Sequence, residues 1–181
     1  DRNAGSSCTM SVSIQQVIDS LKNKYPYAIG EIKTFRGEVS VFVKRELIRE
    51  ICSYLKKEFD FKFIVDITAV DYLGRKTPRF EVVYYLHRFG PDFEENIRIR
   101  LKVEVPEEDP KVYSVTSVWS GANWLEREVY DMFGIEFVGH PDLRRILMPE
   151  DYEAFPLRKD FDVRNREPSK RSFERALKEG T

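Results

Sequence analysis

Residues 97–105 read IRIRLKVEV, and apolar and charged side chains alternate along the whole stretch. A period of two places alternate side chains on opposite faces of a β-strand. The stretch therefore predicts a strand with one face in the core and a charged face toward water or a partner. Two longer strands are predicted before it. Residues 61–69 have apolar side chains at every odd position, and residues 80–86 (FEVVYYL) have them on both faces, which predicts a central strand.

The chain before these three strands predicts two helices and two shorter strands. Residues 13–16 (SIQQ) form a capping-box pattern, in which the serine and the second glutamine satisfy exposed amides at a helix start. Strands are predicted over residues 31–35 and 38–43, and a second helix over residues 44–59 carries one apolar stripe. The order α-β-β-α-β-β-β predicts an α+β fold, a two-layer domain with a mixed sheet over residues 10–120.

Composition and charge exclude several classes of protein. Charged residues make up 34% of the chain, yet the formal net charge is -1, so no long-range field marks a nucleic-acid binder. No stretch approaches the ~18 apolar residues of a membrane span, so direct membrane insertion is not expected. The two cysteines, Cys8 and Cys52, lack the spacing of a metal site, which favours a reducing, cytoplasmic setting. Residues 1–9 (DRNAGSSCT) are interpreted as an expression remnant or a disordered extension, with Met10 as the natural start.

A different organisation is predicted after residue 120. Asn123 and Glu126 form another capping-box pattern, and the helix that follows is expected to end at Gly134, which suits a left-handed conformation. Residues 121–162 are therefore divided between this C-terminal helix and an extended irregular arm, which we expect to lie across another surface. Residues 163–181 carry six basic and three acidic side chains and predict an exposed charged tail.

No catalytic, cofactor-binding or metal-binding residue is predicted. The chain lacks both glycine-rich phosphate-binding motifs, and its two cysteines cannot ligate an Fe–S cluster. Three alternatives stay open. One is a zinc site built from His140, Asp142 and other carboxylates, and another is a stand-alone hydrolase using Glu126, Glu128 and Asp131. The hydrolase would need an enclosed pocket around its carboxylates. The third alternative, a nucleic-acid-binding module that uses the basic tail, would need a continuous basic face.

The most informative run is residues 126–161, EREVYDMFGIEFVGHPDLRRILMPEDYEAFPLRKDF. It resembles the signature region of the complex I 30-kilodalton subunit family, whose members belong to respiratory NADH:quinone oxidoreductase. Several uncommon features occur in order, and the predicted elements upstream suit the same family. One departure is Glu153-Ala154-Phe155-Pro156, where family members often show a glycine and a histidine before the proline. A homologous subunit of a membrane-bound nickel–iron hydrogenase or an F420H2-type dehydrogenase, which use a similar scaffold, remains an alternative.

The resemblance implies a cofactor-free structural subunit in the peripheral arm of complex I, whose electron transfer from NADH to quinone is coupled to ion translocation. It implies partners among the other peripheral-arm subunits, chiefly the quinone-site subunit and the adjacent Fe–S subunits. It also implies a peripheral location at the cytoplasmic face of the cell membrane, held through those partners. For Arg144 and Arg145 we expect carboxylate or carbonyl ligands, at least one of them on a partner subunit. The residues expected at the partner interface are Glu126, Arg127, Glu128, Asp131, His140, Asp142, Arg144, Arg145 and Arg158.

Overall fold

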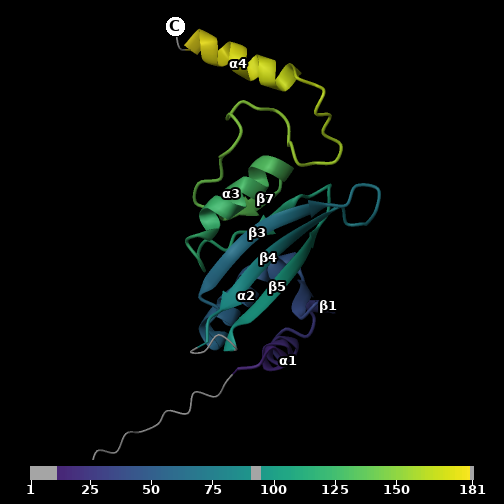
Figure 1. Ribbon diagram of the computed structural model, residues 1–181, viewed down its shortest axis with the longest axis vertical. Helices are drawn as coiled ribbons and strands as arrows, with labels where there is room; N and C mark the ends of the chain where they lie inside the picture. Colours follow the sequence, from purple (N-terminus) through teal and green to yellow (C-terminus); the bar gives the residue numbers. More distant parts are fainter. Residues whose placement is uncertain (1–11, 91–94, 180–181) are drawn as a thin grey trace, which may run out of the picture.

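The computed structural model describes residues 12–90 and 95–179 (Figure 1). The expectations for residues 1–9 and for Met10 lie outside the described residues. The α-β-β-α-β-β-β order expected for the first part of the chain is confirmed. Along the chain the elements are α1 (Ile14–Lys24), β1 (Ile29–Phe35), β2 (Glu38–Val43), the 3-10 helix η1 (Arg45–Leu47), α2 (Ile48–Phe59), β3 (Phe63–Asp71), β4 (Phe80–Arg88), β5 (Ile97–Val105), β6 (Lys111–Tyr113), α3 (Ala122–Phe133), β7 (Glu136–Val138) and α4 (Glu167–Glu179).

The main sheet is mixed, as expected, and within the described ranges it has five strands in the order β1-β2-β5-β4-β3. Neighbouring strands are antiparallel except β2 and β5, which run parallel with Val41 opposite Leu101. The strictly alternating strand, β5, is the middle strand, and its apolar side chains are buried. β4 lies between β5 and β3, which explains why apolar residues occur on both of its faces.

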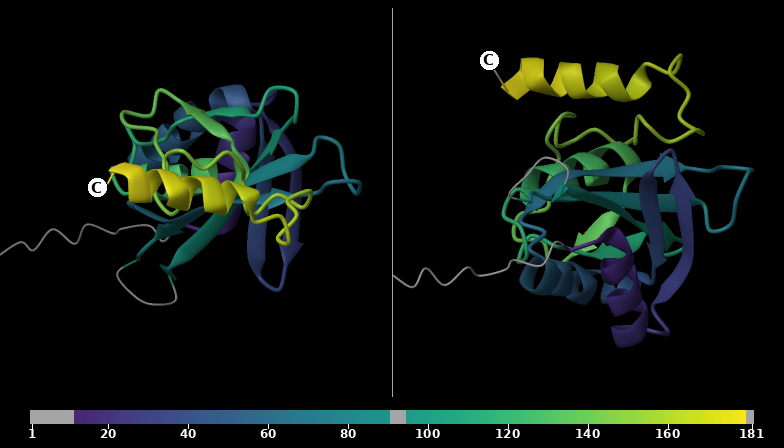
Figure 2. Two further views of the ribbon diagram at one scale, coloured as in Figure 1. Left: turned by 90° about the horizontal axis from the view of Figure 1, so that it is seen from above. Right: turned by 60° about the horizontal axis from the view of Figure 1, so that its bottom comes forward.

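Helices α1, α2 and α3 lie around the sheet (Figure 2). Each of them buries apolar side chains in the core that it shares with the sheet. The expected capping box starts α1: the Ser13 hydroxyl accepts a hydrogen bond from the Gln16 amide at 3.2 Å, and the Gln16 side chain accepts one from the Ser13 amide at 2.8 Å. The second helix begins as the 3-10 turn η1 and is α-helical only from Ile48. α3 packs beside β3 at the edge of the sheet (Figure 1).

The prediction that the apolar side chains along β3 share one face is wrong at the start of the strand. Phe63 and Val65 are about half exposed, whereas Ile67 is buried. The cause is an irregularity in the pairing with β4 between Ile64 and Asp66. An extra residue in a strand reverses which side chains face the core on either side of it. The side chains of β3 that face the core are therefore at even positions before the irregularity and at odd positions after it.

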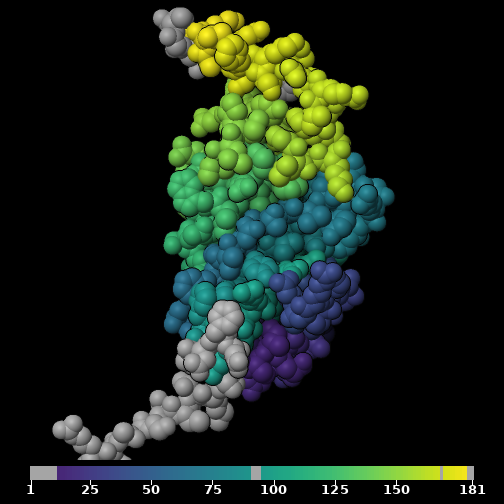
Figure 3. All heavy atoms as spheres, viewed as in Figure 1, coloured from purple at the N-terminus to yellow at the C-terminus, as the bar shows by residue number. Residues whose placement is uncertain are grey.

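Beyond α3 the chain is less regular, yet it contains two elements that the sequence did not predict. β7 pairs in parallel with β6. The arm, defined here as residues 139–162, then passes over the end of α3 toward α4 (Figures 1 and 2). The helix α4 occupies most of the segment for which only a charged tail was expected, and it stands away from the sheet as a projection (Figure 3). Its described side chains are exposed apart from Ser172.

Candidate functional site

Three charged side chains of α3 lie inside the molecule: Glu126, Arg127 and Asp131. The same helix contributes apolar side chains such as Val129 and Phe133 to the core. A buried charge is costly unless it is paired or hydrogen-bonded. The partners of these three side chains therefore show what α3 holds in place.

Asp131 binds the middle of the arm. Its carboxylate contacts the Arg145 guanidinium at 2.5 Å and accepts hydrogen bonds from the amides of Ile146, Leu147 and Met148 at 3.1, 2.7 and 2.8 Å. Burial alone would raise the pKa of Asp131, but these hydrogen bonds outweigh it and hold the pKa below its ordinary value. Four donors on one carboxylate fix both the position and the direction of this irregular segment.

Arg127 holds the same segment by its backbone, because its guanidinium donates to the carbonyl oxygens of Arg144 and Arg145 at 3.0 and 2.9 Å. The Arg145 side chain is only 10% exposed and also donates to the Ala154 carbonyl at 3.1 Å. Arg144 and Arg145 were expected to hold carboxylates or carbonyls, at least one of them on a partner subunit, and the ligands of Arg145 described here all lie within the chain. Arg144 forms an exposed pair with Asp142 at 2.9 Å.

A second attachment holds the arm near its end. The Leu157 amide donates to the Met132 carbonyl at 3.1 Å, and the Arg158 guanidinium donates to the Phe133 carbonyl at 2.5 Å. Both carbonyls belong to the last turn of α3, where a helix leaves carbonyl oxygens without internal partners. Gly134 then ends the helix in the left-handed conformation, as expected. The arm thus supplies the donors that the end of α3 lacks.

A third attachment was not foreseen from the sequence. Arg79, which directly precedes β4, is 6% exposed and contacts Asp71, Glu107 and Asp160 at 2.7, 2.5 and 3.0 Å. The Asp71 carboxylate also accepts a hydrogen bond from the Lys159 amide at 2.8 Å. The hydrogen bond from Arg79 lowers the pKa of Asp71 to about 2. Asp71 and Lys159 are 88 positions apart in the chain, so no local motif could have indicated that they meet.

Glu126 does not have the role that its capping-box pattern predicted. α3 begins at Ala122, so Asn123 lies inside the helix and does not cap it. The fully buried Glu126 carboxylate instead accepts a hydrogen bond from the Val115 amide at 2.7 Å. Because Glu126 and Asp131 have no exposed surface, the expectation that they contact a partner directly is corrected.

The other residues expected at the interface are accessible to different degrees. Glu128 and Asp142 are exposed, and His140 is half-buried. The Nε2 atom of His140 lies 3.1 Å from the Asn123 carbonyl oxygen, and its Nδ1 accepts a hydrogen bond from the Asp142 amide at 3.0 Å. Both ring nitrogens are thus used within the chain. In the described part of the chain, no three His, Cys, Asp or Glu side chains gather closely enough to hold a metal ion, so the zinc alternative gains no support there.

The hydrolase and nucleic-acid alternatives also lack the geometry that they require. Glu126 and Asp131 are fully buried while Glu128 is exposed, so one substrate cannot reach all three carboxylates. The tail does not present a continuous basic face, since several of its basic side chains are paired with acidic ones. These pairs are Arg164–Asp162, Lys170–Glu167, Arg171–Glu153 and Arg175–Asp151.

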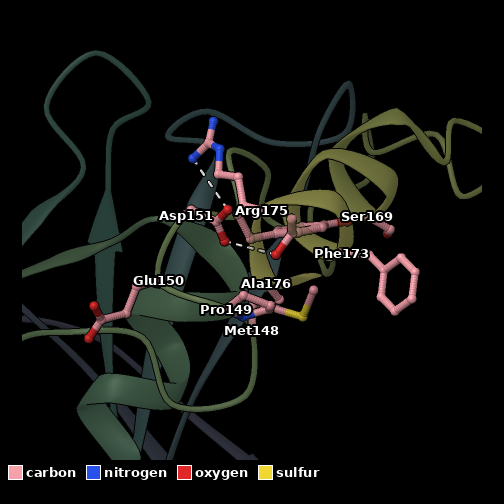
Figure 4. A pocket seen from close by; sticks show the side chains of 10 residues that line it. Met148, Pro149, Glu150, Asp151, Ser169, Phe173, Arg175 and Ala176 are labelled. Atoms are coloured by element: carbon pink, nitrogen blue, oxygen red, sulfur yellow. Dashed lines mark hydrogen bonds and ion pairs between the residues drawn. The ribbon is translucent and has the colours of Figure 1, made fainter. Parts of the chain in front are cut away.

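A groove of about 610 Å³ separates the arm from α4 (Figure 4). One oxygen of Asp151 accepts a hydrogen bond from the Ser172 hydroxyl at 2.8 Å, and the other pairs with Arg175 at 3.3 Å. Apolar side chains from both segments line the groove, among them Met148, Pro149 and Phe173. The arm and α4 therefore share one accessible surface that is partly apolar.

Known proteins resemble this chain over most of its length. Residues 41–167 match the family described as "Respiratory-chain NADH dehydrogenase, 30 Kd subunit". The C subunit of the NADH-quinone oxidoreductase from Geobacter sulfurreducens is 46% identical over 157 residues, which cover 86% of this chain and 94% of that relative. The C subunit of the same enzyme from Roseiflexus sp. (strain RS-1) is 48% identical over 153 residues, which cover 83% of this chain and 85% of that relative.

Two solved structures have a similar fold. The trypsin-resistant fragment (1-134) of Nqo5 superposes with a TM-score of 0.62 and 38% sequence identity, covering 71% of this chain and 98% of the fragment. A chain of the membrane-bound sulfane sulfur reductase, an archaeal respiratory membrane complex, superposes with a TM-score of 0.68 and 27% identity, covering 82% of this chain and 85% of that one.

Proposed function

We propose that this chain, which belongs to the family of the 30 Kd subunit of respiratory-chain NADH dehydrogenase, is a scaffold in NADH-quinone oxidoreductase. In this role it binds no cofactor and presents its arm to partner subunits. The activity belongs to the complex, in which electron transfer from NADH to quinone is coupled to ion translocation. We expect the isolated chain to have no oxidoreductase activity.

The observation that carries this proposal is that several charged side chains of residues 126–161 point into the molecule. Arg127, Asp131 and Arg145 point inward and fix the arm, and the same is true of Arg158 at the end of α3. Ordering a loop before binding removes much of the entropy that association would otherwise cost. A segment without its own periodicity, held at three places, is suited to present a fixed surface to another protein.

The outward side of the arm has the composition of an interface. Leu147 is 62% exposed and Leu157 is 54% exposed, and the arm has no core of its own in which to bury them. Exposed apolar side chains close to polar ones are typical of protein contacts. Arg144, three positions before Leu147, offers an exposed planar guanidinium that suits a carboxylate of a partner. Glu128, His140 and Asp142 remain predicted contacts.

The partners we propose are the quinone-site subunit, chiefly, and the neighbouring Fe–S subunits. None of the helices described here is long and apolar enough to cross a membrane. We therefore propose that the chain is held at the cytoplasmic face of the cell membrane through these partners.

The second candidate is a homologous subunit of a related membrane complex. The observation in its favour is the similar fold found in the sulfane sulfur reductase. The relatives from NADH-quinone oxidoreductase are nearly half identical to this chain, which favours the first proposal. Mass spectrometry of subunits that copurify with the tagged chain from membranes separates the two, because a hydrogenase-type complex would bring a nickel–iron subunit and no NADH-oxidising one.

Replacing Leu147 and Leu157 together by glutamine tests the proposed contact surface. Each leucine that is no longer buried costs on the order of 1–3 kcal/mol, so the affinity for the remaining complex should fall at least about tenfold. The isolated variant should keep its melting temperature, since both side chains are exposed in the free chain. Assembly is measured by native pull-down, and quinone reductase activity is measured in membranes.

The matched control is Phe35→Gln, at an exposed apolar side chain at the end of β1, the edge strand on the other side of the sheet from β3. This variant should assemble like the unmodified chain. Full assembly and full activity of the double variant would show that the arm is not a contact surface.

A further inference from the structure

A group of titratable side chains lies in the core beneath α3. Glu126 of α3, Cys52 of α2 and Tyr84 of β4 are fully buried. Glu126 influences the ionisation of both Cys52 and Tyr84, and Cys52 also influences that of Tyr84. They come from three different elements, so the group lies where α3 packs on the rest of the domain. The proposed function of the chain does not use it.

The hydrogen bonding of this group is incomplete. One oxygen of Glu126 accepts the hydrogen bond from the Val115 amide, but among the described residues neither its Oε2 atom nor the Tyr84 hydroxyl has a hydrogen-bond partner. Arg49 is the cation that acts on Glu126, yet it is not paired with it. Its guanidinium donates to the carbonyl oxygens of Ser114 and Val138 at 2.9 and 3.0 Å.

A buried carboxylate ion with one bare oxygen and no bonded cation is an expensive arrangement. A neutral carboxylic acid in the same place is far less costly, and its hydroxyl adds a donor to the group. We propose that Glu126 is a carboxylic acid in the folded chain and that its ionisation loosens α3, so that pH controls how firmly the arm is held. The link to the arm is covalent, because Arg127 and Asp131 follow Glu126 on the same helix.

The ionisation behaviour of the neighbouring groups agrees with this assignment. Burial raises the pKa of Glu126 to about 7, against the opposing effects of the Ser114 hydroxyl, the Val115 amide and Arg49. Burial also raises the pKa of Cys52 and of Tyr84, so both stay protonated near neutral pH. A carboxyl whose pKa is higher in the folded chain stabilises it fully at low pH. That stabilisation decreases as the pH rises from the ordinary pKa of a glutamate toward 7, and above this range it decreases no further.

Amide hydrogen exchange of Leu147 and Met148 in the full chain tests the proposal. Both amides are bonded to Asp131, so they report on how firmly the arm is held. After correction for the chemical exchange rate, protection should fall about tenfold between pH 6 and pH 8, the factor expected for a group whose pKa changes from 4.5 to about 7. Glu126→Gln cannot ionise and should remove this pH dependence.

Two further variants act as controls. Glu128→Gln makes the same change at an exposed position of the same helix and should leave the pH dependence intact. His140→Gln removes the imidazole that contacts the start of α3, and the effect must persist in its absence. The same pH dependence in Glu126→Gln as in the unmodified chain would overturn the proposal.

A direct measurement on the unmodified chain tests whether Glu126 is a carboxylic acid, even if Glu126→Gln does not fold. The ¹³C chemical shift of a carboxyl carbon follows its ionisation. The Glu126 signal should move between pH 6 and 8. Titration of Glu126 at an ordinary carboxyl pKa would exclude a carboxylic acid at neutral pH and overturn the proposal.

Discussion

Asp131 has the same number of non-hydrogen atoms as asparagine, so Asp131→Asn changes charge and hydrogen bonding with little change in size. One oxygen would become an NH2 group that faces the backbone amides of the arm or the Arg145 guanidinium, all of which are donors. Leaving a buried partner charge unpaired costs about 3–5 kcal/mol. We expect the free energy of unfolding, measured in denaturant, to fall by that order, and the arm amides to lose their protection.

The matched control is Asp142→Asn, which breaks an exposed pair with Arg144 and should cost no more than about 1 kcal/mol. Equal effects at the two positions would show that Asp131 does not hold the arm. Acid gives a second comparison. Because the pKa of Asp131 is lowered by folding, its stabilisation is present above the ordinary carboxyl pKa and is lost as the pH falls through the folded value. Asp131→Asn should lack this loss.

At the scale of single residues, the sequence predicted which side chains need a charged or polar partner better than it predicted which residue that partner is. Arg144 and Arg145 are adjacent and identical, yet one is exposed and the other is paired with a carboxylate 14 positions earlier. An irregular segment has no period, so nothing local tells which of two neighbours faces inward. The prediction that Arg145 needs a carboxylate was sound in its chemistry. The carboxylate proved to be Asp131 of the same chain.

The end of α3 depends on Gly134, which has a φ of 71° and lies against the arm. A Cβ atom there would lie 2.6 Å from the Phe155 ring and 2.7 Å from the Arg158 guanidinium. Gly134→Ala should therefore add a steric cost to the cost of ~1–2 kcal/mol for a left-handed alanine. We expect a total loss of roughly 2–5 kcal/mol in the free energy of unfolding, together with faster amide exchange at Leu157.

Gly37 provides a control with a similar positive φ. Its φ is 80°, and apart from its two chain neighbours no residue has an atom within 4 Å of the position where a Cβ would be. Gly37→Ala should thus show the conformational cost alone, about 1–2 kcal/mol. If the two substitutions cost the same, the arm does not press on the end of α3.

Elements with a clear period were predictable, because the period is a local property of the sequence. This holds for α1, for α2 and for the strictly alternating β5. Elements defined by their neighbours were not predictable. The start of β3 faces outward because of an irregularity in its pairing with β4, and β7 is a strand only because β6 lies beside it. The capping box predicted from Asn123 and Glu126 was wrong for a related reason. The sequence pattern is the same whether the glutamate caps the helix or, as here, is buried and accepts a hydrogen bond from the Val115 amide.

At the scale of the whole molecule, ion pairs join Arg171 and Arg175 of α4 to Glu153 and Asp151 of the arm. Those pairs are largely exposed, and exposed ion pairs contribute about 0–1 kcal/mol each. Truncation after Asp162 should therefore lower the melting temperature of the remaining chain by no more than about 8 °C, while weakening assembly with partner subunits. Calorimetry of the truncated chain checks the first expectation and native pull-down checks the second.

A longer truncation, after Glu150, provides the comparison. It also removes Arg158 and Asp160, which bind the end of α3 and Arg79. We expect this truncation to destabilise the chain far more than the loss of α4 does. A similar loss from both truncations would show that α4 belongs to the folding unit.

The parallel pairing of β2 with β5 has a consequence for synthesis on the ribosome. The hairpins β1–β2 and β3–β4 each form from nearby residues, but they meet only through β5, which lies between them in the sheet. A lone hairpin is marginally stable, and its open edges are templates for pairing with other chains. Both hairpins keep such an edge until residue 105 has emerged. A translational pause before residue 97 would therefore prolong the period in which two nascent chains can pair with each other.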